Sequence, residues 1–207
     1  MNLKYALVAL VIFSFLASAW TGPGRKILVK QKLPMISAHR GASHDAPENT
    51  LAAFSKAIEL GADFLEVDVR TTSDGAQVCL HDQSLKRTTG AEGEVKNRTL
   101  EELKKLTAAQ GFESSPYAGE KIPTLDELCA MVNETNKRFS AHAKLYVDCK
   151  DIDTGEVIRI LSKYQLLDSA VFYGDITVLK EIRKFHENAR LLPAYPGTAH
   201  RPPPTDK

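Results

Sequence analysis

The chain has 207 residues, of which 43% are hydrophobic, and its formal net charge is +1 at pH 7. This length and apolar fraction fit one globular domain with a hydrophobic core. The balanced charge provides neither a basic surface for nucleic acid nor an acidic tail, so we expect no nucleic-acid partner.

The first 19 residues resemble a secretory signal peptide in composition. Lys4 supplies a positive charge, residues 6–16 are apolar, and residues 17–19 are small enough for a cleavage site. The apolar run is shorter than the roughly 20 residues of a bilayer span, although an uncleaved anchor is the alternative. We therefore expect an exported protein, periplasmic or secreted, whose mature chain has no stable membrane span. Residues 20–34 would form a leader.

From residue 35 onward, short apolar segments alternate with amphipathic ones. Six segments have the composition of β-strands: residues 35–39, 64–69, 77–81, 144–149, 169–173 and 190–194. Helices are expected after a cap at Asn49 or Thr50, after capping boxes that begin at Thr99 and Thr124, and over residues 154–164 and 175–186. The alternation predicts an α/β fold of parallel βα units over residues 35–194. The proline-rich tail, residues 195–207, is not expected to fold alone.

Three cysteines, Cys79, Cys129 and Cys149, follow the signal-like segment. An odd number leaves at least one thiol unpaired in an exported protein, and the spacing fits no zinc site. We expect them to be small buried side chains.

Three carboxylates are candidates for a metal site. Side chains alternate along a strand, so Glu66 and Asp68 share one face. Both faces of a parallel sheet are normally covered, and a buried carboxylate pair is costly unless a cation neutralises it. Oxygen ligands favour Mg²⁺ or Ca²⁺, whereas a polar surface stripe is the simpler alternative. Asp148 is a third carboxylate at a strand end, or else a helix cap, and Lys150 faces the same side.

Two histidines each close a predicted strand, His39 and His81. Imidazole, with an ordinary pKa near 6.5, can serve as acid or base, although a lone histidine is more often a structural hydrogen bonder. The planar fork of Arg40 suits a phosphate or carboxylate, and a surface ion pair is its alternative. In a parallel barrel all these strand ends meet at the face that carries the active site.

Several motifs occur in an order typical of one family. They are His39-Arg40-Gly41, PENT at residues 47–50, Glu66-x-Asp68, His81-Asp82, RTTGAEGEV at residues 87–95, TLEELKKL at residues 99–106 and KIPTLDEL at residues 121–128. Together they resemble the glycerophosphodiester phosphodiesterase family over about residues 35–194.

The resemblance implies a TIM barrel that cleaves glycerophosphodiesters, small-molecule substrates, to glycerol 3-phosphate and an alcohol with one divalent cation. It implies that His39 and His81 are the general acid and base, and that Arg40 and Lys150 contact the substrate.

The resemblance also implies a set of metal ligands, Glu66, Asp68 and Asp148. The family usually has glutamate in an E-x-K pattern at the third position, where this chain has Asp148-Cys149-Lys150. Aspartate is one methylene shorter, so either the metal shifts or a water fills the gap.

The barrel predicted here is incomplete, with about six of eight βα units, whereas a full barrel typically has about 250 residues. The chain would be a fragment, a truncated product, or a barrel whose open edge an oligomer covers. Two other functions stay open. One is a catalytically impaired barrel that only binds a ligand or has no function. The other is a phospholipase D-like sphingomyelinase or lysophospholipase, since such enzymes resemble this family and can use aspartate as the third ligand. The PENT and IPTL stretches favour the glycerophosphodiesterase.

Overall fold

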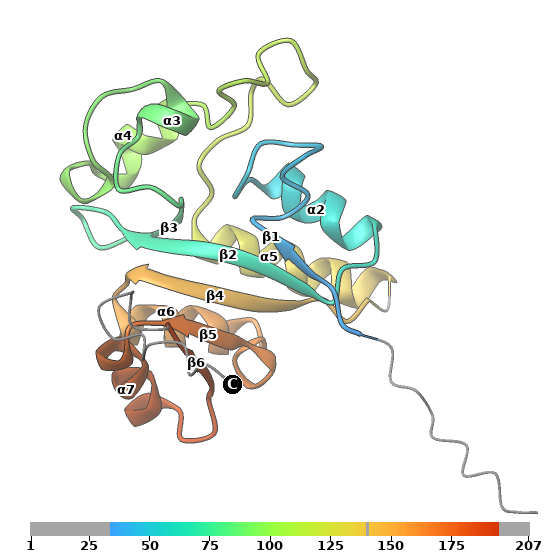
Figure 1. Cartoon of the computed structure of the whole chain (residues 1–207), viewed down its shortest axis with the longest axis vertical. Coiled ribbons are helices and arrows are strands. Elements are labelled where there is room, and N and C mark those ends of the chain that lie inside the picture. Colours follow the sequence, from blue (N-terminus) through green and yellow to red (C-terminus); the bar gives the residue numbers. More distant parts are fainter. Residues whose placement is uncertain (1–33, 140, 195–207) are drawn as a thin grey trace, which may run out of the picture. The chain divides into compact units, whose positions relative to one another are not determined.

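A computed structural model describes residues 34–139 and 141–194 (Figure 1). The expected signal peptide (residues 1–19), nearly all of the leader (residues 20–34) and the tail (residues 195–207) lie outside the described residues. Within the described part, we find no helix with both the length and the apolar character that a bilayer crossing requires.

The described residues form a six-stranded sheet. Its main path runs through five strands in parallel register: β1 (Ser37–His39), β2 (Phe64–Thr71), β4 (Lys144–Asp151), β5 (Val171–Gly174) and β6 (Arg190–Pro193). Among the described strands, β1 and β6 each have one partner, so the sheet is open. The predicted α/β class is confirmed, and the architecture is that of an incomplete TIM-type barrel.

The sixth strand, β3 (Gln77–Cys79), differs from the prediction because it runs antiparallel to β2. Residues 72–76 join the two strands, and a parallel crossover needs a dozen residues or more. The described residues therefore contain five parallel strands, rather than the six expected from the alternation. The hairpin has a consequence for the site, because β3 runs back along β2 until the Leu80 amide donates to the carbonyl oxygen of Asp68, at 3.0 Å.

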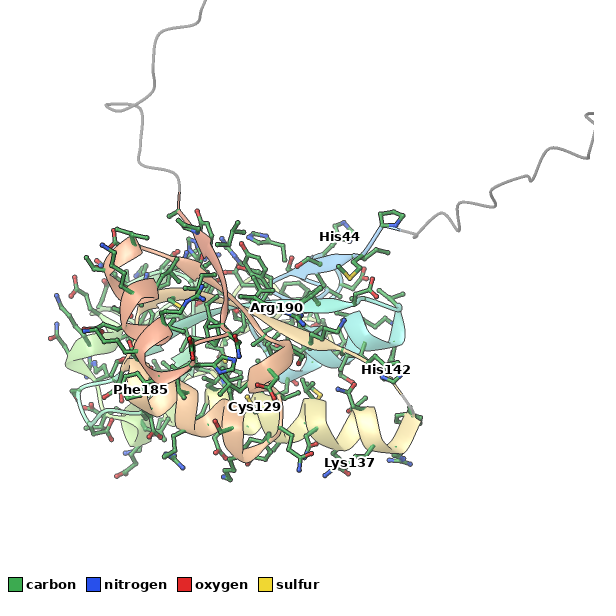
Figure 2. All side chains as sticks on the ribbon, turned by 90° about the horizontal axis from the view of Figure 1, so that it is seen from below. His44, Cys129, Lys137, His142, Phe185 and Arg190 are labelled. Carbon is green, nitrogen blue, oxygen red and sulfur yellow. The ribbon has the colours of Figure 1, made fainter. Side chains whose placement is uncertain are left out.

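Helices cover one face of the sheet. They are α2 (Leu51–Glu59), α5 (Leu125–Phe139), α6 (Thr154–Lys163) and α7 (Ile176–Phe185). Their apolar sides enclose the main core together with Leu65, Val67 and Val69 of β2 and the matching residues of β4. Figure 2 shows the helices that carry Cys129 and Phe185 on one side of the strands. The even-numbered residues of β2 and β4 face the other way, as strand alternation predicts.

Local signals account for the helix starts. Thr50, rather than Asn49, caps α2, because its hydroxyl accepts from the Ala53 amide at 3.2 Å. Both predicted capping boxes are confirmed, at Thr99 before α4 (Leu100–Lys105) and at Thr124 before α5. All three cysteines are buried and unpaired, in keeping with the expectation.

A second, smaller core lies beside the main one. It combines residues of β3 with the segment that follows: Val78, Leu80, Leu85, Val95, Leu103, Ala108 and Ile122. This segment contains the short helix α3 (Lys86–Thr89), the 3₁₀ turn η1 (Val95–Asn97) and α4. Elsewhere in the chain, a 3₁₀ turn, η2 (Leu167–Ser169), precedes β5. The small core therefore holds in place the segment that follows His81 and contains α3.

Candidate active site

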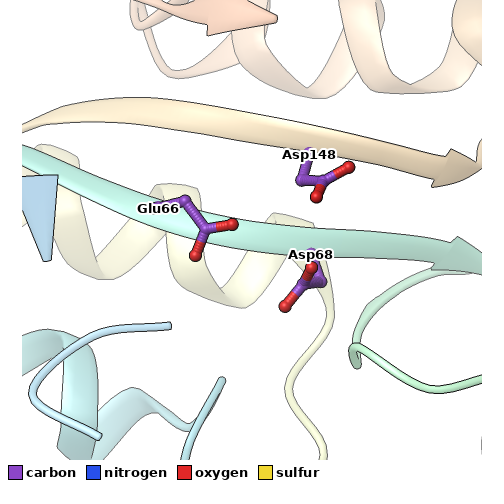
Figure 3. A group of neighbouring side chains, drawn as sticks. All are labelled: Glu66, Asp68 and Asp148. Carbon is purple, nitrogen blue, oxygen red and sulfur yellow. The ribbon is translucent and has the colours of Figure 1, made fainter. Parts of the chain in front are cut away.

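Three buried carboxylates meet on the face of the sheet opposite the main core. Glu66 and Asp68 come from β2, Asp148 comes from β4, and Asp68 is the direct register partner of Asp148 (Figure 3). One oxygen from each side chain lies within 4.8 Å of the others. The shared face that parity predicts for Glu66 and Asp68 is confirmed, and the structure brings Asp148, the third ligand that the resemblance implies, to the same place. We refer to the three as the acidic triad.

The triad has an unbalanced charge. Burial and the neighbouring Asp68 carboxylate raise the pKa of Glu66 to about 7. Lys150 offsets part of the charge, with its Nζ 2.6 Å from Asp148 Oδ2 and 3.2 Å from Asp68 Oδ1. That second contact lacks hydrogen-bond geometry, so the buried Asp68 Oδ1 accepts no hydrogen bond from the described residues. Three buried carboxylates that each bring an oxygen to one place fit a hard divalent cation such as Mg²⁺ or Ca²⁺.

The turn after β1 brings Arg40 against the triad. Its backbone, at φ 58°, is left-handed, and its amide donates to Glu66 Oε2 at 2.7 Å. Its guanidinium donates to Glu48 Oε1 at 3.1 Å, and its Nε lies 3.3 Å from Asp68 Oδ2 without hydrogen-bond alignment. Arg40 therefore has a charge contact with the triad and a partly free fork, as an oxyanion ligand requires.

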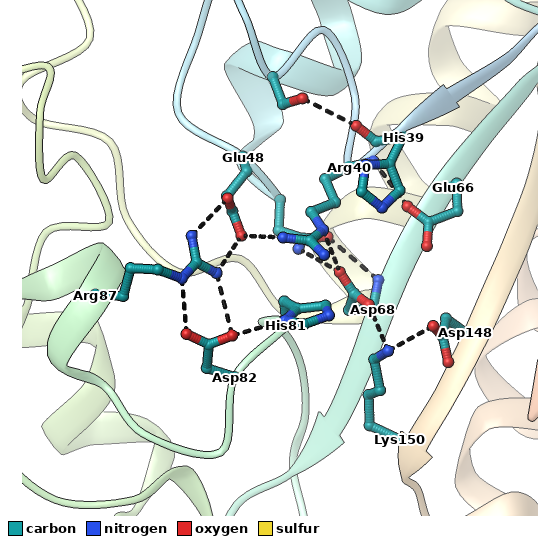
Figure 4. A network of polar contacts seen from close by, with 12 residues as sticks. His39, Arg40, Glu48, Glu66, Asp68, His81, Asp82, Arg87, Asp148 and Lys150 are labelled. Atoms are coloured by element: carbon teal, nitrogen blue, oxygen red, sulfur yellow. Dashed lines mark hydrogen bonds and ion pairs between the residues drawn. The ribbon is translucent and has the colours of Figure 1, made fainter. Parts of the chain in front are cut away.

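The two histidines lie on opposite sides of Arg40 and Asp68 (Figure 4). His39 is exposed at the end of β1, in register with Glu66. His81 follows β3, and its Nδ1 lies 2.6 Å from Asp82 Oδ1. A carboxylate on Nδ1 fixes the orientation of the ring and leaves Nε2 as the nitrogen available for proton transfer. The sequence placed His81 at the end of a parallel strand, whereas the hairpin is what brings it to the level of Asp68.

A chain of ion pairs continues from His81 back to Arg40. Arg87 on α3 donates to Asp82 Oδ2 at 2.7 Å, and its two terminal nitrogens donate to Glu48, each at 2.7 Å. The hydrogen bonds and charge of Arg87 hold the pKa of Asp82 well below its usual range. Burial would raise the pKa of Glu48, but Arg87 and Arg40 lower it below its ordinary value. The network joins the two loops that carry the histidines.

Sequence reasoning missed Asn49, which is fully buried beside the triad. Its Nδ2 donates to Asp68 Oδ2 at 2.8 Å, and its Oδ1 accepts from the Asp68 amide at 3.2 Å. Its backbone lies at φ 56°, a left-handed conformation that asparagine tolerates better than most residues. The PENT motif marked this residue, but only as a possible helix cap.

Fold and site together define an α/β protein of the barrel type. Its acidic triad, which could bind a cation, lies on the sheet face opposite the main core, and two histidines and an arginine flank the triad. Comparison with known families places it more narrowly. The chain belongs to the glycerophosphoryl diester phosphodiesterase family, whose family model matches residues 39–191.

Individual relatives support the assignment. Over 184 residues the chain is 35% identical to a glycerophosphodiester phosphodiesterase of Bacillus subtilis, covering 83% of this chain and 60% of that protein. Over 100 residues it is 51% identical to one of Caldanaerobacter subterraneus, covering 48% and 41% of the two chains. A solved Oleispira antarctica phosphodiesterase, in complex with the product sn-glycerol-3-phosphate, superposes with a TM-score of 0.68 at 28% identity, over 77% of this chain and 65% of that one. The chain thus spans 41% to 60% of the length of these curated relatives.

Proposed function

We propose that this chain hydrolyses glycerophosphodiesters to glycerol 3-phosphate and an alcohol. The observation that carries the proposal is the convergence of the acidic triad, Arg40 and two histidines on one sheet face. The product complex of the Oleispira antarctica relative supports the substrate class.

The acidic triad would hold one divalent cation, Mg²⁺ or Ca²⁺. The three converging carboxylates support this assignment, as does the buried Asp68 Oδ1, which accepts no hydrogen bond from the described residues. When bound, such a cation would draw negative charge from the phosphate oxygens as a Lewis acid. The shorter reach of Asp148, relative to the family's glutamate, makes it the ligand whose role most needs a direct test.

Arg40 and Lys150 would bind the substrate. The guanidinium fork of Arg40 offers parallel donors to a phosphate, and its contacts with Glu48 and Asp68 hold it over the triad. Lys150 bridges two triad carboxylates. Burial lowers the pKa of Lys150, but the contacts with Asp148 and Asp68 raise it above its ordinary value. The Lys150 ammonium is therefore charged and would be able to contact the substrate phosphate.

His39 and His81 would transfer the protons. One imidazole takes a proton from the attacking hydroxyl, which the family resemblance suggests is the neighbouring glycerol hydroxyl of the substrate. The other gives a proton to the alcohol as its P–O bond breaks, which leaves a cyclic phosphate of glycerol. Water then opens this cyclic phosphate to glycerol 3-phosphate, with the two imidazoles exchanging the roles of acid and base. Their positions on opposite sides of Arg40 and Asp68 support this division of labour. Asp82, at 2.6 Å from Nδ1, would hold the His81 ring in one orientation during the transfer.

The histidine roles are tested by His39→Ala and His81→Ala with glycerophosphocholine as substrate. Loss of a general acid or base typically costs 10²–10⁴-fold, so we expect each kcat to fall by at least about 100-fold. His44→Ala is the matched control, because this exposed histidine contacts only Asp45 among the described residues. Near-normal turnover in either variant would overturn the acid–base assignment. Preference for sphingomyelin or lysophosphatidylcholine would favour the phospholipase D-like alternative.

A further inference from the structure

A buried arginine lies directly behind His81 and has no role in the chemistry proposed above. Arg70, on β2, is 7% exposed. Its Nε and Nη2 donate to the carbonyl oxygen of His81, at 3.0 and 2.6 Å. Its Nη1 donates to Asp151 Oδ2, at 2.9 Å. One guanidinium therefore joins the backbone of a proposed catalytic residue to the end of β4.

These contacts hold a segment that the sheet does not hold. Strand β3 ends at Cys79, and the last backbone hydrogen bond along it is from the Leu80 amide to the Asp68 carbonyl. Beyond this point, the Arg70 fork is the donor that reaches the His81 carbonyl among the described residues. The Asp82 contact orients the imidazole ring, whereas Arg70 fixes the backbone from which the ring projects.

The geometry is specific to arginine. Two nitrogens of a rigid planar fork converge on one oxygen, which restricts both the position and the direction of that carbonyl. A buried guanidinium is costly unless it is paired, and Asp151 supplies the charge that compensates it. Asp151 directly follows Lys150, so the same arginine sets the spacing between His81 and the end of β4 that carries the triad-bound lysine.

We propose that Arg70 is a positioning residue that sets the distance of the His81 imidazole from the acidic triad. The expected effect on kcat rests on the proposed function, because the position of His81 affects turnover only if His81 transfers a proton. Its structural part is independent of turnover, because the orientation of the His81 ring can be observed in a protein that catalyses nothing.

The kinetic test compares Arg70→Met with wild type on glycerophosphocholine. A displacement of about 1 Å at a reacting group can cost about 10²-fold, so we expect kcat to fall between about 10- and 100-fold with little change in KM. Arg159→Met is the matched control, because it makes the same substitution at an exposed arginine on α6 whose two hydrogen bonds are both to Glu156. It should retain kcat within about threefold, because Arg159 lies outside the contacts that hold His81.

A double variant separates positioning from general destabilisation. If Arg70 acts through His81, Arg70→Met should have little further effect in a His81→Ala background, because residues that act as a unit are non-additive. An equal loss in both backgrounds would contradict the proposal. Should Arg70→Met fail to fold, Arg70→Lys carries the same test, since it keeps the buried charge but cannot donate two parallel hydrogen bonds.

The readout that does not depend on activity is the NMR signal of the His81 Nδ1–H. In wild type the contact with Asp82 should protect this proton, and in Arg70→Met the signal should broaden or disappear while it persists in Arg159→Met. An unchanged signal in Arg70→Met would refute the positioning role even if the enzyme proved inactive. If the wild-type protein hydrolyses no substrate but the signal changes in Arg70→Met, the proposed function is refuted and the positioning role of Arg70 stands.

Discussion

Asp68 is the most constrained residue of the site. Asn49 holds one carboxylate oxygen and the backbone amide, Arg40 adds a charge contact, and the other oxygen faces Lys150. Residues that hold a metal ligand in place commonly matter nearly as much as the ligand itself. The buried Asn49 therefore has a testable share in cation binding.

We expect Asn49→Ala to weaken Mg²⁺ or Ca²⁺ binding by about 10- to 100-fold, the usual cost of losing a group that orients a ligand. Calorimetric titration of the purified protein with each cation measures this. The matched control is Asn136→Ala, because Asn136 makes the same two kinds of hydrogen bond to the backbone of Ala143, at 2.9 and 3.1 Å, away from the triad. Equal losses of affinity in both variants would mean that Asn49 acts only through stability.

The sequence could predict the residues of the site that follow strand periodicity. Alternation put Glu66 and Asp68 on one face of their strand and Asp148 with Lys150 on one face of another, and the family resemblance joined Asp148 to the pair. Asn49 and Arg70 were missed because their meaning depends on partners far along the chain, 19 residues away for Asp68 and 81 for Asp151. No local pattern encodes such a pairing, so only the folded structure reveals it.

The turn between β1 and α2 is an element whose shape the site requires. Gly41 lies at φ +81°, and a Cβ there would be 2.7 Å from the carbonyl carbon of Ala53 and 2.8 Å from its oxygen. Since those atoms belong to the backbone of α2, they cannot move aside as a flexible side chain would. The close approach sets where Arg40, the preceding residue, meets Glu66 and Asp68.

Gly41→Ala should therefore be costly for two reasons, backbone strain and overlap. We expect a loss of roughly 3 kcal/mol in the free energy of unfolding, measured by urea denaturation. Gly61→Ala is the control, because Gly61 has a similar φ of +85° with open space around it, so it should lose only about 1 kcal/mol. Equal losses in the free energy of unfolding at the two positions would show that the close contact between Gly41 and the backbone of α2 does not limit the turn.

The β2–β3 hairpin is the element for which sequence reasoning went wrong. The six strand segments were correct, but the third was counted as parallel because strands and helices alternate elsewhere. The short connection, residues 72–76, was a sufficient signal for an antiparallel turn. The sequence does indicate a turn at residues 73–75, but the strand after it was still grouped with the parallel strands. The position of His81, which follows β3 and lies beside Asp68, was therefore not explained.

At the scale of the molecule, the described sheet is open and exposes apolar side chains at its edge strands. Met35 and Ile36 precede β1 with exposures of 53% and 59%, and Leu192 on β6 is 47% exposed. Unpaired edges tend to associate with other chains. That an oligomer covers this edge stays a prediction, as does export, which rests on residues 1–19 outside the described range.

The central claim is that the acidic triad and its surroundings perform cation-dependent hydrolysis of a glycerophosphodiester. The direct test is ³¹P NMR of glycerophosphocholine incubated with the full chain after EDTA treatment, before and after Mg²⁺ or Ca²⁺ is restored. We expect the diester signal to convert to glycerol 3-phosphate only with the cation present, and Asp68→Asn to abolish the conversion. Conversion that is unaffected by EDTA, or that persists in Asp68→Asn, would contradict the account.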